Sequence, residues 1–183
     1  MPRLPAPRNW GTFQVEPFAE YRLRWPKKYS KVPDEVIENW IYRHWREFQA
    51  WLPLLPLDWK YEIVSMKSEE ILTVGHVGEW MTTLKYWGDD LLDGRQRKIT
   101  WLGRFMLQQG TTPSPIIVAR NAGAWDHPRE HANPMREPLQ LIEGHMRLAY
   151  LQALIRRTHP SVQASHKVVI ATLPIISTSS APQ

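Results

Sequence analysis

The sequence predicts a mixed α/β (α+β) fold, with a small mixed sheet flanked by helices and preceded by a tryptophan-rich helical extension. Two observations carry this prediction. Short apolar runs typical of buried strands, at residues 116–119 and 139–142, alternate with longer segments whose apolar residues recur at helical spacing. The chain also contains 10 tryptophans, and most of them fall in its first third. Large aromatic side chains at that density indicate a packed extension rather than a disordered tail.

Length and composition set the domain organisation that we expect. With 183 residues and 43% hydrophobic content, the chain can form one core of ordinary size. We expect residues 1–57 to form an arm and a helix packed on the body. Residues 58–175 should form the sheet domain, and residues 176–183 a frayed tail.

Charge and residue usage narrow the classes of function. The formal net charge of +5 favours acidic partners such as DNA or nucleotides. The absence of cysteine excludes disulfides, thiolate metal sites and a cysteine nucleophile. No run of about 18 apolar residues occurs, so we expect a cytoplasmic protein without membrane insertion.

The first 57 residues divide into two segments. Residues 1–32 are rich in proline, basic and aromatic residues, which predicts an extended arm. Its basic and aromatic side chains could contact single-stranded nucleic acid, or the aromatic side chains could be buried and the charged ones solvated. Pro33, Asp34 and Glu35 are typical of a helix start, and apolar residues at helical spacing extend that helix to about residue 52, before Pro53.

The remaining elements follow from periodicity and from glycine and proline positions. A half-buried alternation predicts a strand at residues 59–64, and residues 69–74 suggest a short strand or the start of a turn. We further expect helices at 79–92, 99–109 and 147–157, strands at 116–119, 139–142 and 168–171, and a long polar loop at 121–137.

The junction between the strand at 139–142 and the helix that follows it is the most informative feature of the chain. Gly144 allows a sharp turn there, His145 follows it in the junction, and Arg147 lies in the first turn of the helix. A helix start offers backbone N–H groups and the positive end of a dipole, and an arginine fork suits phosphate oxygens. The junction therefore predicts a phosphate-binding site.

The same residues carry a family resemblance. The segment Ile-Glu-Gly-His-Met-Arg-Leu-Ala at 142–149 resembles the signature of the ParB/sulfiredoxin superfamily, a Gly-x-x-Arg turn between a strand and a helix. Residues 99–109, then Gly110 and the Pro-Ser-Pro-Ile-Ile-Val-Ala strand at 113–119, resemble the family's helix, glycine stop and strand. Residues 166–171 resemble its closing strand, so the resemblance covers roughly residues 60–173.

The resemblance implies a function and a site. Gly144 and Arg147 would hold the phosphate of ATP, of another nucleotide or of DNA. His145 and Glu143 would assist the attack of water, and Glu143 would hold Mg²⁺. Because His145 stands where sulfiredoxins have a cysteine, sulfiredoxin chemistry is excluded.

Within the superfamily the chain is most similar to plasmid fertility inhibition factors. Only about ten residues follow the last strand, which leaves no room for the helix-turn-helix domain of partition proteins. The resemblance implies ATP hydrolysis, Mg²⁺-dependent DNA cleavage and a block on DNA transfer by components of a conjugative or type IV secretion system.

Alternative interpretations remain at two levels. The chain could be a catalytically inactive inhibitor module that binds DNA or protein, or a nucleotide-dependent small-molecule kinase. The junction itself could be an ordinary strand-to-helix turn with Arg147 in a salt bridge and His145 exposed.

Two further clusters could hold a metal ion. The segment His-Pro-Arg-Glu-His at 127–131 has the letters of a zinc-hydrolase motif, but Pro128 argues against the continuous helix that this motif needs. Asp126, Glu130 and His131 could instead lie over the turn and contribute to a Mg²⁺ site. The acidic residues Asp89, Asp90 and Asp93 are expected to form a solvated helix face.

Overall fold

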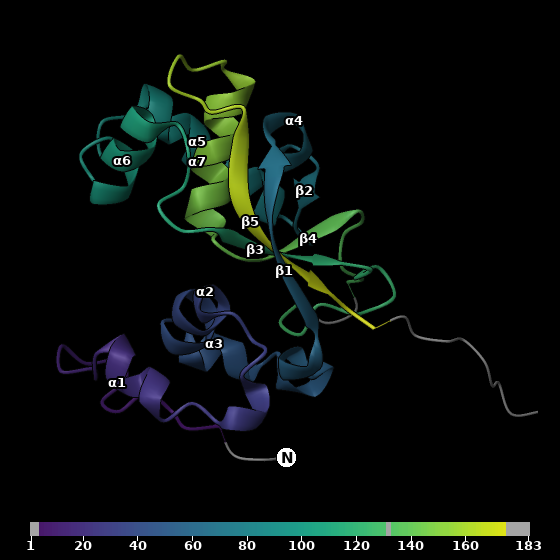
Figure 1. Cartoon of the computed structure of the whole chain (residues 1–183). Coiled ribbons are helices and arrows are strands. Elements are labelled where there is room, and N and C mark those ends of the chain that lie inside the picture. Colours follow the sequence, from purple (N-terminus) through teal and green to yellow (C-terminus); the bar gives the residue numbers. More distant parts are fainter. Residues whose placement is uncertain (1–3, 131–132, 175–183) are drawn as a thin grey trace, which may run out of the picture. The chain divides into compact units, whose positions relative to one another are not determined.

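The computed structural model describes residues 4–130 and 133–174, and the chain divides into two compact units (Figure 1). One unit lies within residues 1–61 and the other within residues 62–183. The tail predicted at 176–183 lies outside the described residues. In the described ranges no helix combines the length and the apolar character that crossing a membrane requires.

The second unit is built on a five-stranded sheet with the strand order β1-β5-β3-β4-β2. Its strands are β1 (Lys60–Lys67), β2 (Val74–Gly75), β3 (Ile116–Arg120), β4 (Leu139–Glu143) and β5 (Ser165–Thr172). Strand β3 is parallel to β5 and antiparallel to β4, and β2 is parallel to β4. The sheet is therefore mixed, which confirms the predicted α+β class.

Strand β3 lies at the centre of the sheet because its sequence is apolar on both faces. Ile116, Ile117, Val118 and Ala119 are all buried, as is expected for a strand without a solvated face. Ile116 and Val118 belong to the hydrophobic cluster that includes Leu148. The segment 121–137, predicted to be a long loop, connects β3 to β4, and its described residues contain no helix and only the isolated bridge between Asp126 and Pro134.

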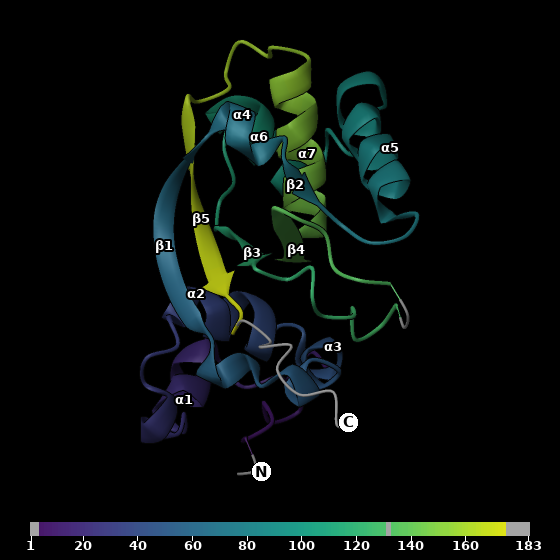
Figure 2. The same cartoon turned by 90° about the vertical axis from the view of Figure 1, so that its right-hand side faces the viewer.

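Four helices accompany this sheet: α4 (Ser68–Ile71), α5 (Trp80–Asp93), α6 (Trp101–Gln109) and α7 (His145–Arg156). Helix α7 contacts β3, α4, α5 and α6. Figure 2 shows α5 on the side of α7 that faces away from β1 and β5. Helix α7 is thus the middle layer of the unit.

Burial along helix α7 fixes its position. Every residue from 147 to 154 is buried. Gln152 adds polar anchors, because its Nε2 donates to the carbonyl oxygens of Ile71 and Val74, each at 3.0 Å. Hydrogen bonds from a buried amide favour a single packing arrangement. The first turn of α7 is consequently held in a defined place.

Helices α5 and α7 approach each other closely at Gly88. A Cβ atom at that position would lie 2.4 Å from the carbonyl oxygen of Ala149 and 2.8 Å from Cβ of Ala153. Both distances are shorter than van der Waals contact, so the crossing needs a glycine on one helix and alanines on the other.

We predict that Gly88→Ala destabilises the chain by about 1–3 kcal/mol, because the added methyl group overpacks the α5–α7 contact. Urea unfolding monitored by circular dichroism measures this change. Thr82→Ala, at an exposed position of the same helix, is the control and should change stability by no more than about 0.5 kcal/mol. Equal stability of Gly88→Ala and wild type would contradict the close crossing.

Two sequence expectations are wrong in detail. Residues 69–74, expected to be a short strand or the start of a turn, begin with helix α4, because the Glu70 carboxylate accepts the Lys67 N–H at 2.8 Å and so caps a short helix. A turn follows the helix, and of these residues Val74 alone belongs to a strand, β2. The arm at 1–32 is not extended throughout: it contains α1 (Phe18–Leu23) and the 3₁₀ turn η1 (Lys27–Tyr29). Helix α1 forms because it buries Tyr21 completely.

The helix predicted from residue 34 to about 52 is present in three pieces. They are α2 (Asp34–Val36), the π-helical η2 (Ile37–Tyr42) and α3 (Trp45–Gln49), followed by the 3₁₀ turns η3 (Leu52–Leu54) and η4 (Pro56–Asp58). The ring of Trp40 packs within this unit against Phe48, Trp51 and Trp59 at centroid distances of 5.0, 5.5 and 6.2 Å. Aromatic packing therefore forms its core.

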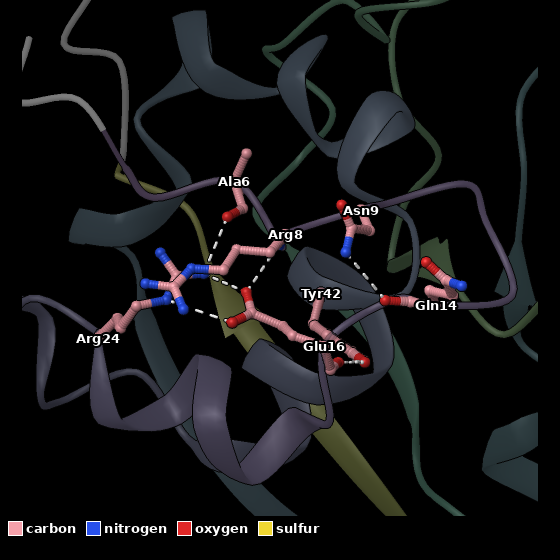
Figure 3. A network of polar contacts seen from close by, with 7 residues as sticks. All are labelled: Ala6, Arg8, Asn9, Gln14, Glu16, Arg24 and Tyr42. Atoms are coloured by element: carbon pink, nitrogen blue, oxygen red, sulfur yellow. Dashed lines mark hydrogen bonds and ion pairs between the residues drawn. The ribbon is translucent and has the colours of Figure 1, made fainter.

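A buried carboxylate organises the start of the first unit (Figure 3). Glu16 is only 6% exposed; it accepts the backbone N–H of Arg8 at 2.7 Å and forms an ion pair with Arg24. Its own carbonyl oxygen accepts the Tyr42 hydroxyl. Burial by itself would raise the pKa of Glu16, but the Arg8 N–H and the Arg24 guanidinium hold that pKa below its usual value.

We expect the Glu16 network to make stability depend on pH. The pKa of Glu16 is lower in the folded chain than in the unfolded chain, so its contribution is present above the usual value near 4.5 and is lost as pH falls through the folded value. Thermal unfolding of wild type and Glu16→Gln between pH 7 and pH 3 measures this. Glu16→Gln should be less stable at pH 7 and lose less stability on acidification; parallel curves would contradict it.

Candidate functional site

The turn between β4 and α7 has the geometry that its glycine predicts. Gly144 has φ of +102°, in the region that favours glycine, and α7 begins at the next residue. A Cβ at Gly144 would lie 2.8 Å from Cγ2 of Ile116 and 3.3 Å from Nε of Arg147. The close approach that this glycine permits is therefore to a β3 side chain and to the arginine.

Arg147 is held by groups of the protein itself. It is 9% exposed, forms an ion pair with Glu143 and donates to the hydroxyl of Ser114; its Nη1 also lies 3.2 Å from the Ser114 carbonyl oxygen. The salt bridge of the ordinary-turn interpretation is thus present. A phosphate that used this fork would compete with the Glu143 carboxylate.

His145 points to a different set of partners. Its Nε2 lies 3.2 Å from Nε2 of His76, and the two ring centroids are 5.0 Å apart. The ring of His127 lies 5.1 Å from that of His76. Three of the six histidines in the described ranges therefore meet here, from the β2–α5 connection, the β3–β4 loop and the start of α7. His145 is half-buried rather than exposed.

Trp80 and Glu130 complete the surroundings of the three histidines. The Trp80 ring lies 4.9 Å from the ring of His145 and 5.4 Å from that of His76. Its Nε1 donates to Oε1 of Glu130 at 3.3 Å. We call His76, Trp80, His127, Glu130 and His145 the histidine cluster.

Hydrogen bonds fix the ring protons of the three histidines of the cluster. Nδ1 of His76 lies 3.2 Å from the carbonyl oxygen of Val77, which can only accept, so this nitrogen carries the proton and Nε2 holds a lone pair. The Nε2 of His145 must then donate to it in the neutral pair. Nδ1 of His127 accepts the Arg129 N–H at 3.3 Å, which places the His127 proton on Nε2.

Burial favours the neutral form of two histidines of the cluster, His76 and His127. It lowers the pKa of His76, although the Val77 carbonyl and the Glu130 carboxylate act in the opposite direction. The pKa of His127 falls to about 3, through burial first and then through repulsion from His76, His145 and Arg129. Neutral imidazoles of this kind can accept a proton or bind a metal ion.

The predicted site residues divide between two groups of side chains. Arg147 and Glu143 form one group with Ser114, and His145 joins the histidine cluster, because residues two positions apart on a helix do not share a face. Of the 127–131 segment, His127 and Glu130 reach the cluster without a helix, as Pro128 predicted, and His131 lies outside the described residues.

Sequence reasoning missed His76 and Trp80. Their only local signal was the glycine-flanked turn at 75–78 before a helix, which does not reveal a contact with a residue 69 positions away. The acidic residues of α5 are paired rather than simply solvated: Asp89 with Lys85, Asp90 with Arg97, and Asp93 with Arg157.

Comparison with protein-family models, with curated proteins and with solved structures finds no match for this chain.

We predict that His127 stays neutral as pH falls through 6.5, the usual pKa of histidine, towards its own value of about 3. The unfolded chain takes up a proton in that interval and the folded chain does not, so stability should fall as pH decreases across it. Imidazole nitrogen NMR follows the protonation, and His127→Gln should flatten the pH dependence of thermal unfolding between those values. Titration of His127 near pH 6.5 would contradict the buried cluster.

Proposed function

We propose that the chain binds the phosphate groups of a nucleotide, with ATP as the first candidate, or of DNA at the first turn of α7, and that it hydrolyses phosphate esters there. The observation that carries the proposal is the position of Arg147 and of the histidine cluster at opposite sides of one helix start. The helix start attracts anions, Arg147 suits phosphate oxygens, and neutral histidines can accept a proton from water.

The carboxylate of Glu143 acts in this proposal as an internal substitute for phosphate. It forms an ion pair with the Arg147 guanidinium, which also donates a hydrogen bond to the Ser114 hydroxyl. A bound phosphate would displace the carboxylate, which would then be available to hold Mg²⁺, as the resemblance to the ParB/sulfiredoxin superfamily implies. Ligand binding and rearrangement of the ion pair would thus be coupled.

The histidines would provide the proton transfers of hydrolysis. As water attacks phosphorus and the bond to the leaving oxygen breaks, His145 would accept the proton of water. Its Nε2–H faces the lone pair of His76 at 3.2 Å, so the pair can pass a proton inward. Burial of His76 maintains the neutral acceptor that this step needs.

At the level of the whole protein, we propose a plasmid fertility inhibition factor with a ParB/sulfiredoxin-like fold, similar to the oncogenic suppression activity protein. It would act in the cytoplasm and block DNA transfer through a conjugative or type IV secretion system by hydrolysing ATP and cleaving DNA with Mg²⁺. The mixed sheet, the Gly144 turn and the positive net charge support this assignment.

A second candidate is an inhibitor that binds DNA or protein without catalysis. The surface around the start of α6 favours it: Ile99 is 65% exposed and Trp101 is 67% exposed. Exposed Arg95 and Arg104 lie in the same segment, which contains no acidic residue from 95 to 109. Basic residues around an exposed tryptophan are suited to stacking on single-stranded DNA.

Binding of ATP in the absence of Mg²⁺, measured by isothermal titration calorimetry, tests the phosphate site apart from the metal-binding role of Glu143. We predict that Glu143→Gln tightens binding by about tenfold, equivalent to about 1.4 kcal/mol, because it removes the competing charge. Arg147→Lys should weaken binding by at least about tenfold, because lysine lacks the planar fork. Arg147→Ala is less suitable, since it would leave the Glu143 carboxylate, whose side chain is only 13% exposed, without its cation.

Asp89→Asn, which removes a carboxylate paired with Lys85 on α5, is the matched control and should leave ATP affinity unchanged. Circular dichroism confirms that each variant is folded. If Glu143→Gln and Arg147→Lys both bind ATP as wild type does, Arg147 has a structural role only and the proposed site is wrong.

A further inference from the structure

We propose that His76 and His145 together bind a divalent transition metal ion, of which Zn²⁺ is the typical case, through their Nε2 atoms. The site does not depend on the phosphate chemistry proposed above, since the pair would bind the ion in a catalytically inactive chain as well. It also differs from the Mg²⁺ site expected at Glu143 in its residues and in the class of metal.

The distance between the two nitrogens carries the proposal. Two nitrogens that each lie about 2.0–2.1 Å from one ion are roughly 2.9 Å apart at a right angle and roughly 3.4 Å apart at the tetrahedral angle. The Nε2 atoms of His76 and His145 are 3.2 Å apart. The pair can therefore accept an ion between its nitrogens with little movement of either ring.

The orientation of His76 supports the same conclusion independently. Metal-binding histidines commonly donate their second ring N–H to a backbone carbonyl or a carboxylate, which fixes the ring and directs the lone pair to the metal. His76 has this arrangement, with Nδ1 facing the Val77 carbonyl oxygen at 3.2 Å and Nε2 facing His145. Its side chain is also buried, at 2% exposure, which restricts ring rotation.

The ligand atoms select the class of ion. Imidazole nitrogens suit Zn²⁺, Co²⁺, Ni²⁺ and Cu²⁺, whereas Mg²⁺ prefers oxygen ligands in an octahedral arrangement. Among residues 4–130 and 133–174, no group of three or more histidine, aspartate or glutamate side chains is arranged to hold a metal ion. The site thus has two protein ligands, and water or a bound anion would occupy the other positions.

His127 lines the site without serving as a third ligand. Its Nδ1 accepts the Arg129 N–H, so its proton resides on Nε2 and the ring acts as a donor. The Glu130 carboxylate, which accepts from Trp80, is the nearest acidic group that the hydrogen bonds place at the cluster. The negative charge of this carboxylate stabilises a cation bound between the two imidazole rings.

Zinc titration of the purified full-length chain, without a histidine tag and after treatment with a chelator, tests the site. A chromophoric chelator competes for the metal and reports the affinity. We expect saturable binding of one Zn²⁺ per chain. His145→Gln and His76→Gln should each weaken binding by at least about tenfold. His159→Gln, which removes a histidine hydrogen-bonded to Ser161 and outside the cluster, should bind as wild type does.

A second measurement on the wild type keeps the test independent of how the variants fold. Nitrogen NMR of the imidazole rings should show the His145 ring proton moving from Nε2 to Nδ1 when Zn²⁺ is added, because the ion replaces the hydrogen bond to His76. The proposal is overturned if the wild type shows no saturable binding, if binding survives in both His76→Gln and His145→Gln, or if Zn²⁺ leaves the His145 tautomer unchanged.

Discussion

The burial of helix α7 is the constraint on which the rest of the second unit depends. The helix is enclosed by β3, α4, α5 and α6, and every residue from 147 to 154 is buried. The close contact of α7 with Gly88 of α5 and the hydrogen bonds of Gln152 fix the position of the helix. The first turn of the helix inherits this rigidity, so His145 and Arg147 are positioned by the core rather than by a mobile loop.

Helical geometry then divides the chemistry at that turn. Arg147 faces Ser114 and Glu143, whose carboxylate neutralises it, whereas His145 faces His76 and Trp80. A phosphate ligand would therefore exchange one internal ion pair for a charge-assisted contact, and its net affinity would be a difference between two similar energies. A metal ion between His76 and His145 would instead replace one hydrogen bond between neutral rings, which is a smaller loss than that of a buried ion pair.

The sequence predicts local structure well where the spacing of apolar residues follows a single pattern, that of a strand or that of a helix. The strands at 139–142 and 168–171 and the helix from residue 147 lie close to their predicted bounds, because their apolar residues are continuous or recur at helical spacing. The π-helical segment at 37–42 is not predictable in this way, since its backbone hydrogen-bond pattern depends on how the aromatic core packs. The contact between His76 and His145 is not predictable either, because it depends on the tertiary pairing of β2, which precedes His76, with β4, which precedes His145.

The most direct test of the proposed phosphate chemistry is phosphate release by the purified chain from ATP and from CTP, with Mg²⁺ or Zn²⁺, with and without DNA. Arg147→Lys and His145→Gln would be measured beside the wild type, once both are known to be folded. We expect release by the wild type that falls at least about tenfold in each variant, in the range that loss of one positioned group costs. Release that is equal in all three chains would contradict a phosphate site at the first turn of α7.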